Sequence, residues 1–382
     1  MPRRGARRVT RIQEDAVKKT ARIAAVAAIA ALALTACGDR EDNGDEGSDN
    51  NSPTATTTEE SSPTDAGTQY TDFKACMVSD SGGFDDKSFN QTSHDGLEAA
   101  AEKYGVQTSE AESSDPSQFA DNIQRLVDEG CNQITTVGFL LGDATEAAAK
   151  KAKNVDFAIV DFAYEKPPAN LKGLTFNTAE PSFLAGYVAA AKSESGVVGT
   201  FGGLNIPTVT IFMTGFVQGV EYYNEENGAA VEVLGWDVEA GDGSFTNDFE
   251  DKTAGQSLAQ TMIDNGADVI FPVAGPAGLG GLQAAQDADA WGIWVDTDGC
   301  VSAAEYCDSL LTSVVKGMDV AVEQAIVDSA SGQFNNEVYT GTLENGGVSL
   351  APYGPEADID EELSGKVEEL KQMIIDGEIT VG

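Results

Sequence analysis

The chain has 382 residues, of which 63 are acidic and only 23 are Lys or Arg, so its formal charge is −40. Such a charge repels nucleic acid phosphates and anionic lipid headgroups, which argues against a nucleic-acid-binding function. The length is sufficient for two domains of ordinary size.

The N-terminal segment has the pattern of an export signal. Basic residues precede an uncharged apolar run at 23–34, which is shorter than the roughly 20 residues that a membrane-spanning helix needs. Its length is typical of a secretory signal peptide. The run ends in LTACG (34–38), which resembles a bacterial lipobox. We therefore expect residues 1–36 to be removed and Cys37 to be lipidated, which would anchor the protein to the outer face of the cell membrane. The alternative is an ordinary signal peptide with a buried cysteine.

Residues 38–71 are almost entirely Asp, Glu, Gly, Ser, Thr, Asn and Pro. A segment with so few apolar side chains cannot bury enough surface to offset the entropy of ordering. We therefore predict a disordered tether over 37–71, between the lipid and a folded body.

The body alternates short apolar strands with amphipathic helices, the pattern of a parallel sheet covered on both faces. In the first half we predict strands at 73–78, 106–111, 133–137 and 157–160, and helices at 88–104, 116–129 and 143–153. In the second half we predict strands near 197–201, 230–234, 269–272 and 292–295, with helices between them.

The two halves also resemble each other. LVDEGCNQI (126–134) matches MIDNGADVI (262–270), and AIVDF (158–162) matches IWVDT (293–297) in the same register. In the first match, a helix end and a Gly precede a buried strand. In the second match, an aspartate follows the end of an apolar strand. The sequence therefore predicts an α/β protein with two Rossmann-like lobes that face each other across a ligand cleft.

The last segment should cross back between the lobes. We expect strands at 310–314, 338–342 and 348–350, and helices at 318–331 and 361–376. The predicted N-terminal lobe comprises 72–178 and about 300–332, and the C-terminal lobe comprises 179–299 and about 333–382.

Four cysteines remain after Cys37, an even number for an exported protein. Cys300 and Cys307 could close a short loop, and Cys76 and Cys131 fall on strands that should be neighbours. We expect disulfides rather than a zinc site, because the chain lacks a close Cys pair and has a single histidine.

Three aspartates lie just beyond predicted strand ends, where open α/β sheets bind ligands: Asp80, Asp161 and Asp296. The first of them lies in the segment SDSGGFDDKSFNQ (79–91), whose glycines permit a tight turn. Ser88 is a candidate helix cap there, with Phe89 beside the cleft.

That segment resembles the opening motif of the basic membrane protein (BMP) family of nucleoside-binding lipoproteins. Further segments resemble the same family in the same order: EPSFLAGYVAA (180–190), VGTFGGLNIPTV (198–209), FMTGFVQGV (212–220), GADVIFPVAGPAGLG (266–280), WVDTDG (294–299) and LTSVVKGMDVAV (311–322). The resemblance covers the whole body. It implies a type I periplasmic-binding-protein fold and a purine nucleoside ligand.

The resemblance also implies two stacking side chains. Phe89 should stack on one face of the base and Phe249 on the other, with Phe245 as the rival because this chain carries extra residues there. Gly275 matches a glycine that lets the backbone approach the ligand. Ala277 stands where we would expect a threonine, so one hydroxyl contact is absent.

Polar contacts follow from the same resemblance. Asn90 and Asp161 match positions that hydrogen-bond the base edge. Asp296 and Lys316 match positions that hold the ribose hydroxyls, and Asp80 lies beside them. Independently of the family, carboxylates accept hydrogen bonds from vicinal hydroxyls or purine N–H groups, and a lysine would neutralise one buried carboxylate.

We find no P-loop, HExxH or GxSxG motif, so the sequence predicts a binding protein and not an enzyme, without cofactor or metal. The expected protein is a monomer that closes its lobes on a nucleoside and delivers it to an ABC permease driven by a separate ATPase. The alternatives are the same fold binding a free sugar or polyol, and a surface sensor that signals.

Overall fold

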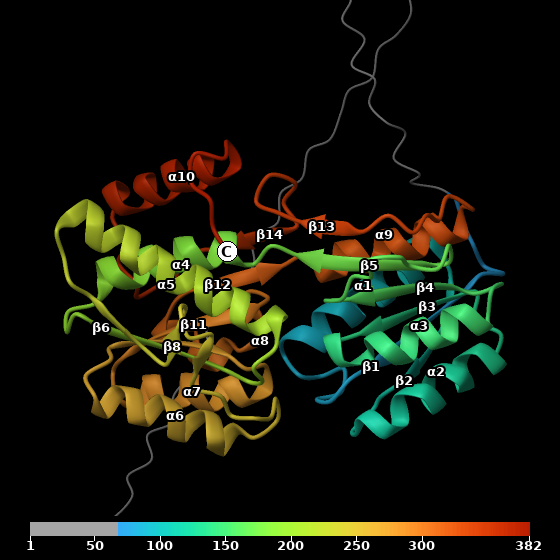
Figure 1. Ribbon diagram of the computed structural model, residues 1–382, viewed down its shortest axis with the longest axis horizontal. Helices are drawn as coiled ribbons and strands as arrows, with labels where there is room; N and C mark the ends of the chain where they lie inside the picture. The colour runs from blue at the N-terminus through green and yellow to red at the C-terminus, as the bar shows by residue number, and fades with distance from the viewer. Residues whose placement is uncertain (1–67) are drawn as a thin grey trace, which may run out of the picture. The chain divides into compact units, whose positions relative to one another are not determined.

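Two six-stranded sheets organise the part of the chain that the computed structural model describes, residues 68–382 (Figure 1). The first sheet has the order β13-β5-β4-β3-β1-β2, and all of its pairings are parallel. Its strands are β1 (Lys74–Ser79), β2 (Gln107–Ala111), β3 (Gln133–Val137), β4 (Asp156–Val160), β5 (Leu171–Phe176) and β13 (Tyr339–Gly341).

The second sheet has the order β14-β12-β11-β10-β6-β7. Its strands are β6 (Val197–Gly202), β7 (Glu232–Leu234), β10 (Val269–Val273), β11 (Trp291–Asp296), β12 (Leu310–Lys316) and β14 (Val348–Leu350). Only β14 is antiparallel to its neighbour. A small hairpin, β8 (Trp236–Asp237) with β9 (Asp242–Gly243), lies beyond β7.

Helices cover both faces of each sheet, and we call each sheet with its helices a lobe. In the first lobe, α1 (Phe89–Tyr104) and α9 (Met318–Ala330) pack on one face, and α2 (Phe119–Asp128) and α3 (Gly142–Lys151) on the other. In the second lobe, α4 (Ala179–Lys192), α5 (Pro207–Asn227) and α10 (Glu361–Ile375) lie opposite α6 (Lys252–Asp264) and α7 (Pro276–Asp287). The short elements are η1 (Pro116–Gln118), η2 (Phe139–Leu141), α8 (Gly299–Ser302) and η3 (Ala304–Ser309).

The predicted parallel α/β arrangement is confirmed, and local chemistry explains it. The central strands β3 and β10 are buried along their whole length, as expected for strands covered on both faces. Gly105, at φ +70°, ends α1 and donates its N–H to the carbonyl of Ala101. Pro207 begins α5, where its missing N–H costs nothing.

The chain passes between the lobes three times. It crosses after β5, at Gly317 after β12, and between β13 and β14. The sequence predicts that residues from about 300 to 332 belong together to the first lobe, but β12 pairs with β11 inside the second sheet. Only α9, which packs on α1, returns there. Likewise β13 pairs with β5 of the first sheet, although the sequence predicts it in the second lobe. A short strand carries the same apolar pattern whichever sheet it joins, so the sequence could not assign it.

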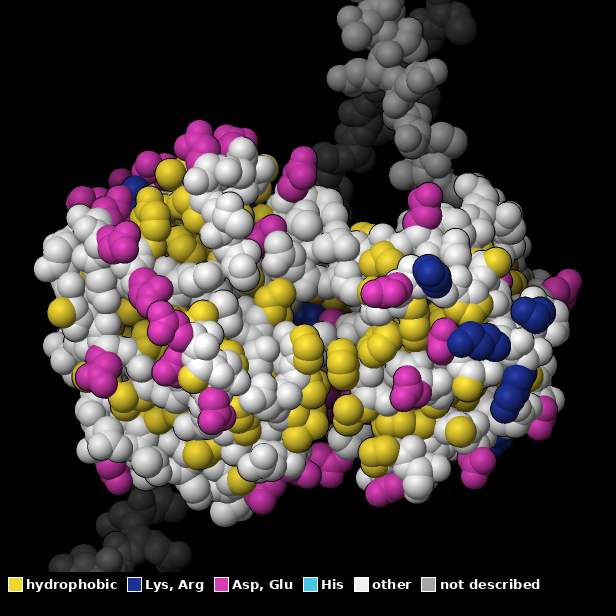
Figure 2. Space-filling model, in the orientation of Figure 1, with side chains coloured by type: hydrophobic (Ala, Val, Ile, Leu, Met, Phe, Trp, Pro, Cys, Tyr) yellow, Lys and Arg dark blue, Asp and Glu magenta, His cyan; other side chains and the backbone are white. Residues whose placement is uncertain are grey.

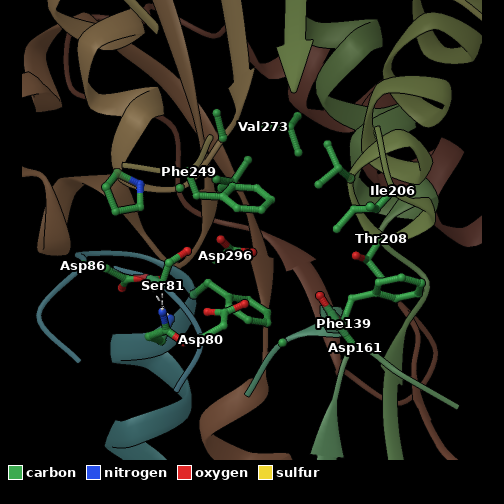
Figure 3. A pocket seen from close by; sticks show the side chains of 18 of the residues that line it. Asp80, Ser81, Asp86, Phe139, Asp161, Ile206, Thr208, Phe249, Val273 and Asp296 are labelled. Carbon is green, nitrogen blue, oxygen red and sulfur yellow. Dashed lines mark hydrogen bonds between the residues drawn. The ribbon is translucent and has the colours of Figure 1, made fainter. Parts of the chain in front are cut away.

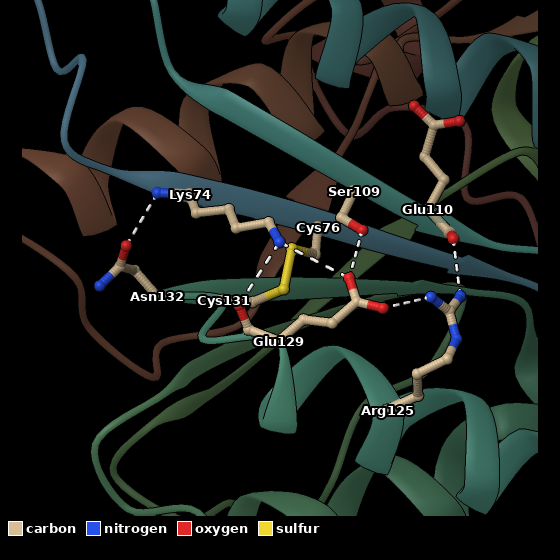
Figure 4. Close-up of a disulfide and its surroundings, with 8 residues drawn as sticks. All are labelled: Lys74, Cys76, Ser109, Glu110, Arg125, Glu129, Cys131 and Asn132. Atoms are coloured by element: carbon tan, nitrogen blue, oxygen red, sulfur yellow. Dashed lines mark hydrogen bonds and ion pairs between the residues drawn. A yellow bond between two sulfur atoms is a disulfide. The ribbon is translucent and has the colours of Figure 1, made fainter.

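Two disulfides link the four cysteines of the body. Cys76 of β1 is bonded to Cys131, which lies just before the neighbouring strand β3, and both are buried (Figure 4). Cys300 is bonded to Cys307, and this bond closes the loop between β11 and β12.

Polar contacts surround the buried disulfide at the edge of the first lobe (Figure 4). Glu129 accepts a hydrogen bond from Ser109 of β2 (2.6 Å) and pairs with Arg125 of α2 (2.5 Å) and with Lys74 of β1 (3.5 Å). These contacts tie the end of α2 to β1 and to the edge strand β2.

The expected signal peptide, lipidated Cys37 and most of the tether lie outside the described residues. The folded body begins slightly earlier than expected, because Gln69 and Tyr70 hydrogen-bond to the end of α1. Within residues 68–382, no helix combines the length and the apolar character needed to cross a membrane.

Candidate ligand-binding site

A pocket lies between the two lobes at the carboxyl ends of their strands (Figure 3). It contains about 640 Å³ of space not filled by protein atoms, counting its open mouth. All the predicted ligand-binding residues line it: Asp80, Phe89, Asn90, Asp161, Phe249, Gly275, Asp296 and Lys316. Figure 2 shows the groove between the lobes, with hydrophobic side chains on both walls.

Strand ends supply most of the polar side chains, as the geometry of open α/β sheets requires. Asp80 follows β1, Asp161 follows β4, and Asp296 and Lys316 end β11 and β12. The backbones at Asp161 and Asp296 have φ of +66° and +70°. This left-handed conformation costs an ordinary residue about 1 kcal/mol or more, and aspartate is among the residues that tolerate it.

Lys316 lies at the centre of the pocket and is only 2% exposed. Its Nζ lies 2.6 Å from Oδ2 of Asp161 and 3.9 Å from Oδ1 of Asp296. Three aromatic rings surround the ammonium group, with centroids 4.7, 5.4 and 5.7 Å away: Phe89, Phe176 and Phe212. Ring faces and carboxylates together compensate for the loss of water around this buried cation.

Asp296 has a second partner across the interface. The hydroxyl of Ser88, in the first lobe, donates to Oδ2 of Asp296 at 2.6 Å. Burial raises the pKa of Asp296, while Lys316 and Ser88 oppose the rise. The ion pair of Lys316 with Asp161 and this hydrogen bond therefore both join the lobes.

Asp86, and not Ser88, caps the first helix. Although Ser88 occupies the N-cap position of α1, its side chain makes no capping hydrogen bond. The Asp86 carboxylate instead accepts the backbone N–H groups of Ser88, Asn90 and Gln91 at 2.9–3.0 Å. Burial raises the pKa of Asp86 to about 6, and the three N–H bonds oppose this rise. The cap fixes the segment that presents Phe89.

Asp80 lies beside Asn90 on the first lobe. Its side chain is partly exposed to the pocket, but protein atoms surround it on the other sides. This burial raises the pKa of Asp80 to about 8. A hydrogen bond with Asn90 lowers the pKa, and the charges of Asp86 and Asp161 raise it. Asp80 is therefore mostly protonated at neutral pH and offers both a donor and an acceptor.

Asn90 is 1% exposed, and its amide is only half used. Its Nδ2 donates to the carbonyl of Ser81 at 3.0 Å, whereas its buried Oδ1 accepts no hydrogen bond from the described residues. A buried acceptor without a donor is costly, so this oxygen suits a ligand N–H group.

The two candidate second aromatics have different surroundings. Phe249 lines the pocket and lies against Gly203, where a side chain would collide with its ring (Figure 3). Phe245 instead packs edge-on against Trp236, with centroids 6.1 Å apart, and does not line the pocket. The N–H of Ala277 donates to the carbonyl of Phe249 at 2.7 Å, so the start of α7 holds this loop in place.

Sequence reasoning missed several lining residues, all apolar except Thr208: Phe139, Leu140, Ile206, Thr208 and Phe212. Phe139 and Leu140 follow β3, and the others lie between the end of β6 and the first turns of α5. The rule that located the aspartates would have found these segments too, since it applies to every strand end.

Two α/β lobes with a pocket that both line define a solute-binding protein of the periplasmic-binding-protein type. Residues 73–382 match the family described as ABC transporter substrate-binding protein, PnrA-like, and the chain belongs to this family. Its members are extracytoplasmic substrate-binding proteins. The expected family and fold are thus confirmed.

Relatives support this assignment along most of the chain. The chain is 30% identical to "ABC transporter nucleoside-binding protein BmpA" of Lactococcus lactis, covering 83% of this chain and 91% of that protein. It is 31% identical to "Basic membrane protein A" of Borreliella burgdorferi, covering 81% and 87%. A solved solute-binding protein of an Aeropyrum pernix ABC transporter system superposes with a TM-score of 0.72 at 26% identity, covering 81% and 92%.

Proposed function

We propose that this substrate-binding protein captures a purine nucleoside between its lobes and delivers it to an ABC permease. The observation that carries the proposal is the convergence of all the predicted ligand residues, from both lobes, on one pocket. A relative whose name states nucleoside binding supports the same ligand class.

The base would lie between aromatic rings from opposite lobes. Phe89 begins α1 of the first lobe, and Phe249 lies in the loop before α6 of the second lobe. Stacking on aromatic side chains contributes about 1–3 kcal/mol per base. The free Oδ1 of Asn90 would accept a base N–H, and the protonated Asp80 beside it presents a donor and an acceptor.

The sugar would lie against the second lobe. Asp296 would accept hydrogen bonds from the ribose hydroxyls, and Lys316 would donate to them. Because Lys316 also reaches Asp161, ligand entry requires the lobes to separate and this pair to rearrange. A ligand that touches both lobes then favours their closed arrangement.

We further propose that lipidated Cys37 holds the mature protein on the outer face of the membrane and that one copy suffices for transport. A Cys37→Ala variant should leave the membrane fraction and lose incorporation of a labelled fatty acid. Retention of the label would refute the assignment of this cysteine.

The ligand is tested by calorimetric titration of the purified protein with adenosine, guanosine, inosine, uridine, ribose and adenine. Purine nucleosides should bind more tightly than ribose or adenine. Phe249→Ala should weaken adenosine binding by roughly ten-fold or more, because it removes one stacking partner. Phe245→Ala is the matched control and should retain affinity. Binding of ribose alone, without nucleosides, would instead indicate the sugar-binding function.

A further inference from the structure

We propose that Lys87 and Glu305 form a latch across the mouth of the cleft, which sets ligand affinity without touching the ligand. Lys87 belongs to the loop between β1 and α1 of the first lobe, and Glu305 to η3 of the second. Their side chains meet at 2.7 Å, and neither residue lines the pocket. The pair therefore forms only when the lobes are together.

The backbone at Lys87 supports a role for its side chain. Its φ is +63°, a left-handed conformation that glycine adopts without steric cost and lysine does not. Its N–H donates to the side chain of Gln91 at 3.1 Å, and the Asp86 cap fixes the next residue. Strained residues of this kind persist where the surrounding structure holds them, and they cluster at functional positions.

The backbone at Glu305 is also held in place by the surrounding structure. It lies inside the loop that the disulfide between Cys300 and Cys307 closes. Its backbone carbonyl accepts a hydrogen bond from Gln286 of α7 at 3.0 Å. The hydrogen bond with Lys87 lowers the pKa of the Glu305 carboxyl, which favours its charged form. The same helix α7 begins at the pocket with Pro276, so the latch and the site share a rigid support.

The exposure of the Lys87–Glu305 pair limits how much it can stabilise the closed arrangement of the lobes. The two side chains are 39% and 51% exposed, and exposed ion pairs contribute about 0.2–1 kcal/mol, which corresponds to at most about a five-fold change in the closing equilibrium. Salt screens such a pair. Because the latch does not contact the ligand, it should change the affinity for every ligand by the same factor.

The test measures closure directly, independently of the nucleoside proposal. Single-molecule energy transfer between dyes on α2 and α6, introduced through noncanonical amino acids, reports the separation of the lobes. Without added nucleoside, Lys87→Gln and Glu305→Gln should each lower the closed fraction. The double variant should behave like either single variant, and the charge exchange Lys87→Glu with Glu305→Lys should restore closure at low salt.

Lys103 and Glu323 provide the matched control. They also pair at 2.7 Å, but both belong to the first lobe, between α1 and α9. Lys103→Gln and Glu323→Gln should leave the closed fraction unchanged.

Affinity provides a second readout, with adenosine and inosine as probes. Glu305→Gln should weaken both by the same roughly two- to five-fold, and the loss should vanish at high salt, while the melting temperature stays constant. Replacing both Cys300 and Cys307 by Ser should weaken binding similarly, and adding Glu305→Gln should then have no further effect. The proposal is overturned if closure and affinity do not change, or if the control pair gives the same losses. If neither nucleoside binds the wild-type protein, the energy-transfer result still decides the latch, and only the nucleoside proposal fails.

Discussion

Asp161 of the first lobe and Asp296 of the second occupy equivalent positions in the two similar halves of the sequence, but they bind different partners. Each ends or follows a buried strand, has a positive φ and is less than 10% exposed. Their partners differ. Asp161 receives the ammonium group of Lys316 at 2.6 Å, whereas Asp296 receives the hydroxyl of Ser88 at 2.6 Å and the same ammonium at 3.9 Å.

The sequence repeat thus determines where each carboxylate lies but not which charges surround it. Both aspartates are bound by a residue from the opposite lobe, yet Lys316 is the only cation that lines the pocket among the described residues. A single ammonium group therefore serves two buried carboxylates, and it is closer to one of them. The following predictions test this asymmetry.

The largest effect should come from removing the shared cation. Lys316→Met leaves two buried carboxylates without a counterion, which should cost about 3–5 kcal/mol in the free energy of unfolding, measured with urea at pH 7.5.

Lys366→Met is the control for that measurement. Lys366 pairs with Glu226 at 2.7 Å near the surface of the second lobe, so its loss should cost no more than about 1 kcal/mol. Equal losses for the two lysines would contradict the central role of Lys316.

An intermediate effect should distinguish the two aspartates. Asp161→Asn removes the close partner of Lys316 and should cost about 2–3 kcal/mol. Asp296→Asn keeps an oxygen that accepts the Ser88 hydroxyl, so its cost should be about 1 kcal/mol. The same urea titrations measure both. A larger cost for Asp296→Asn would mean that Lys316 depends mainly on the more distant carboxylate.

A change with pH, and not a fixed loss of stability, should distinguish Asp80→Asn from wild type. Because the folded-state pKa of about 8 lies above the ordinary value near 4, the folded protein holds a proton that the unfolded chain releases. Ionisation of Asp80 in the unfolded chain thus lowers the free energy of unfolding of the wild-type protein as the pH rises from about 4 to 8. The variant lacks this loss, so its stability relative to wild type should increase across that window, by up to about 5 kcal/mol in total, and level off above it. Melting temperatures from pH 4.5 to 9.5 measure this, and a constant difference would show that Asp80 is ionised throughout.

The fold and the places of three candidate aspartates could be predicted from the sequence, because both follow from the positions of the strands. Asp80, Asp161 and Asp296 could be placed because the carboxyl ends of parallel strands meet at one edge of each sheet. The family resemblance added Phe89 and Lys316, which no periodicity identifies.

Other features depend on contacts between distant segments and could not be read from local patterns. Ser88 has the sequence of a helix cap, but its hydroxyl binds the other lobe, and Asp86 caps the helix instead. The choice between Phe249 and Phe245 depended on a loop without periodicity. The sequence likewise could not predict which sheet β12 joins, because any buried strand has the same apolar pattern.

The three passages of the chain between the lobes also determine how this protein can be divided. A fragment that ends near residue 300 would lack α9 and β13 from the first lobe, and β12 and β14 from the second. Neither of the two similar halves of the sequence is therefore a complete folding unit, so neither could be exchanged or deleted by itself. A protease that cuts one passage still leaves the lobes joined through the other two, so limited digestion would nick this receptor before it could separate it.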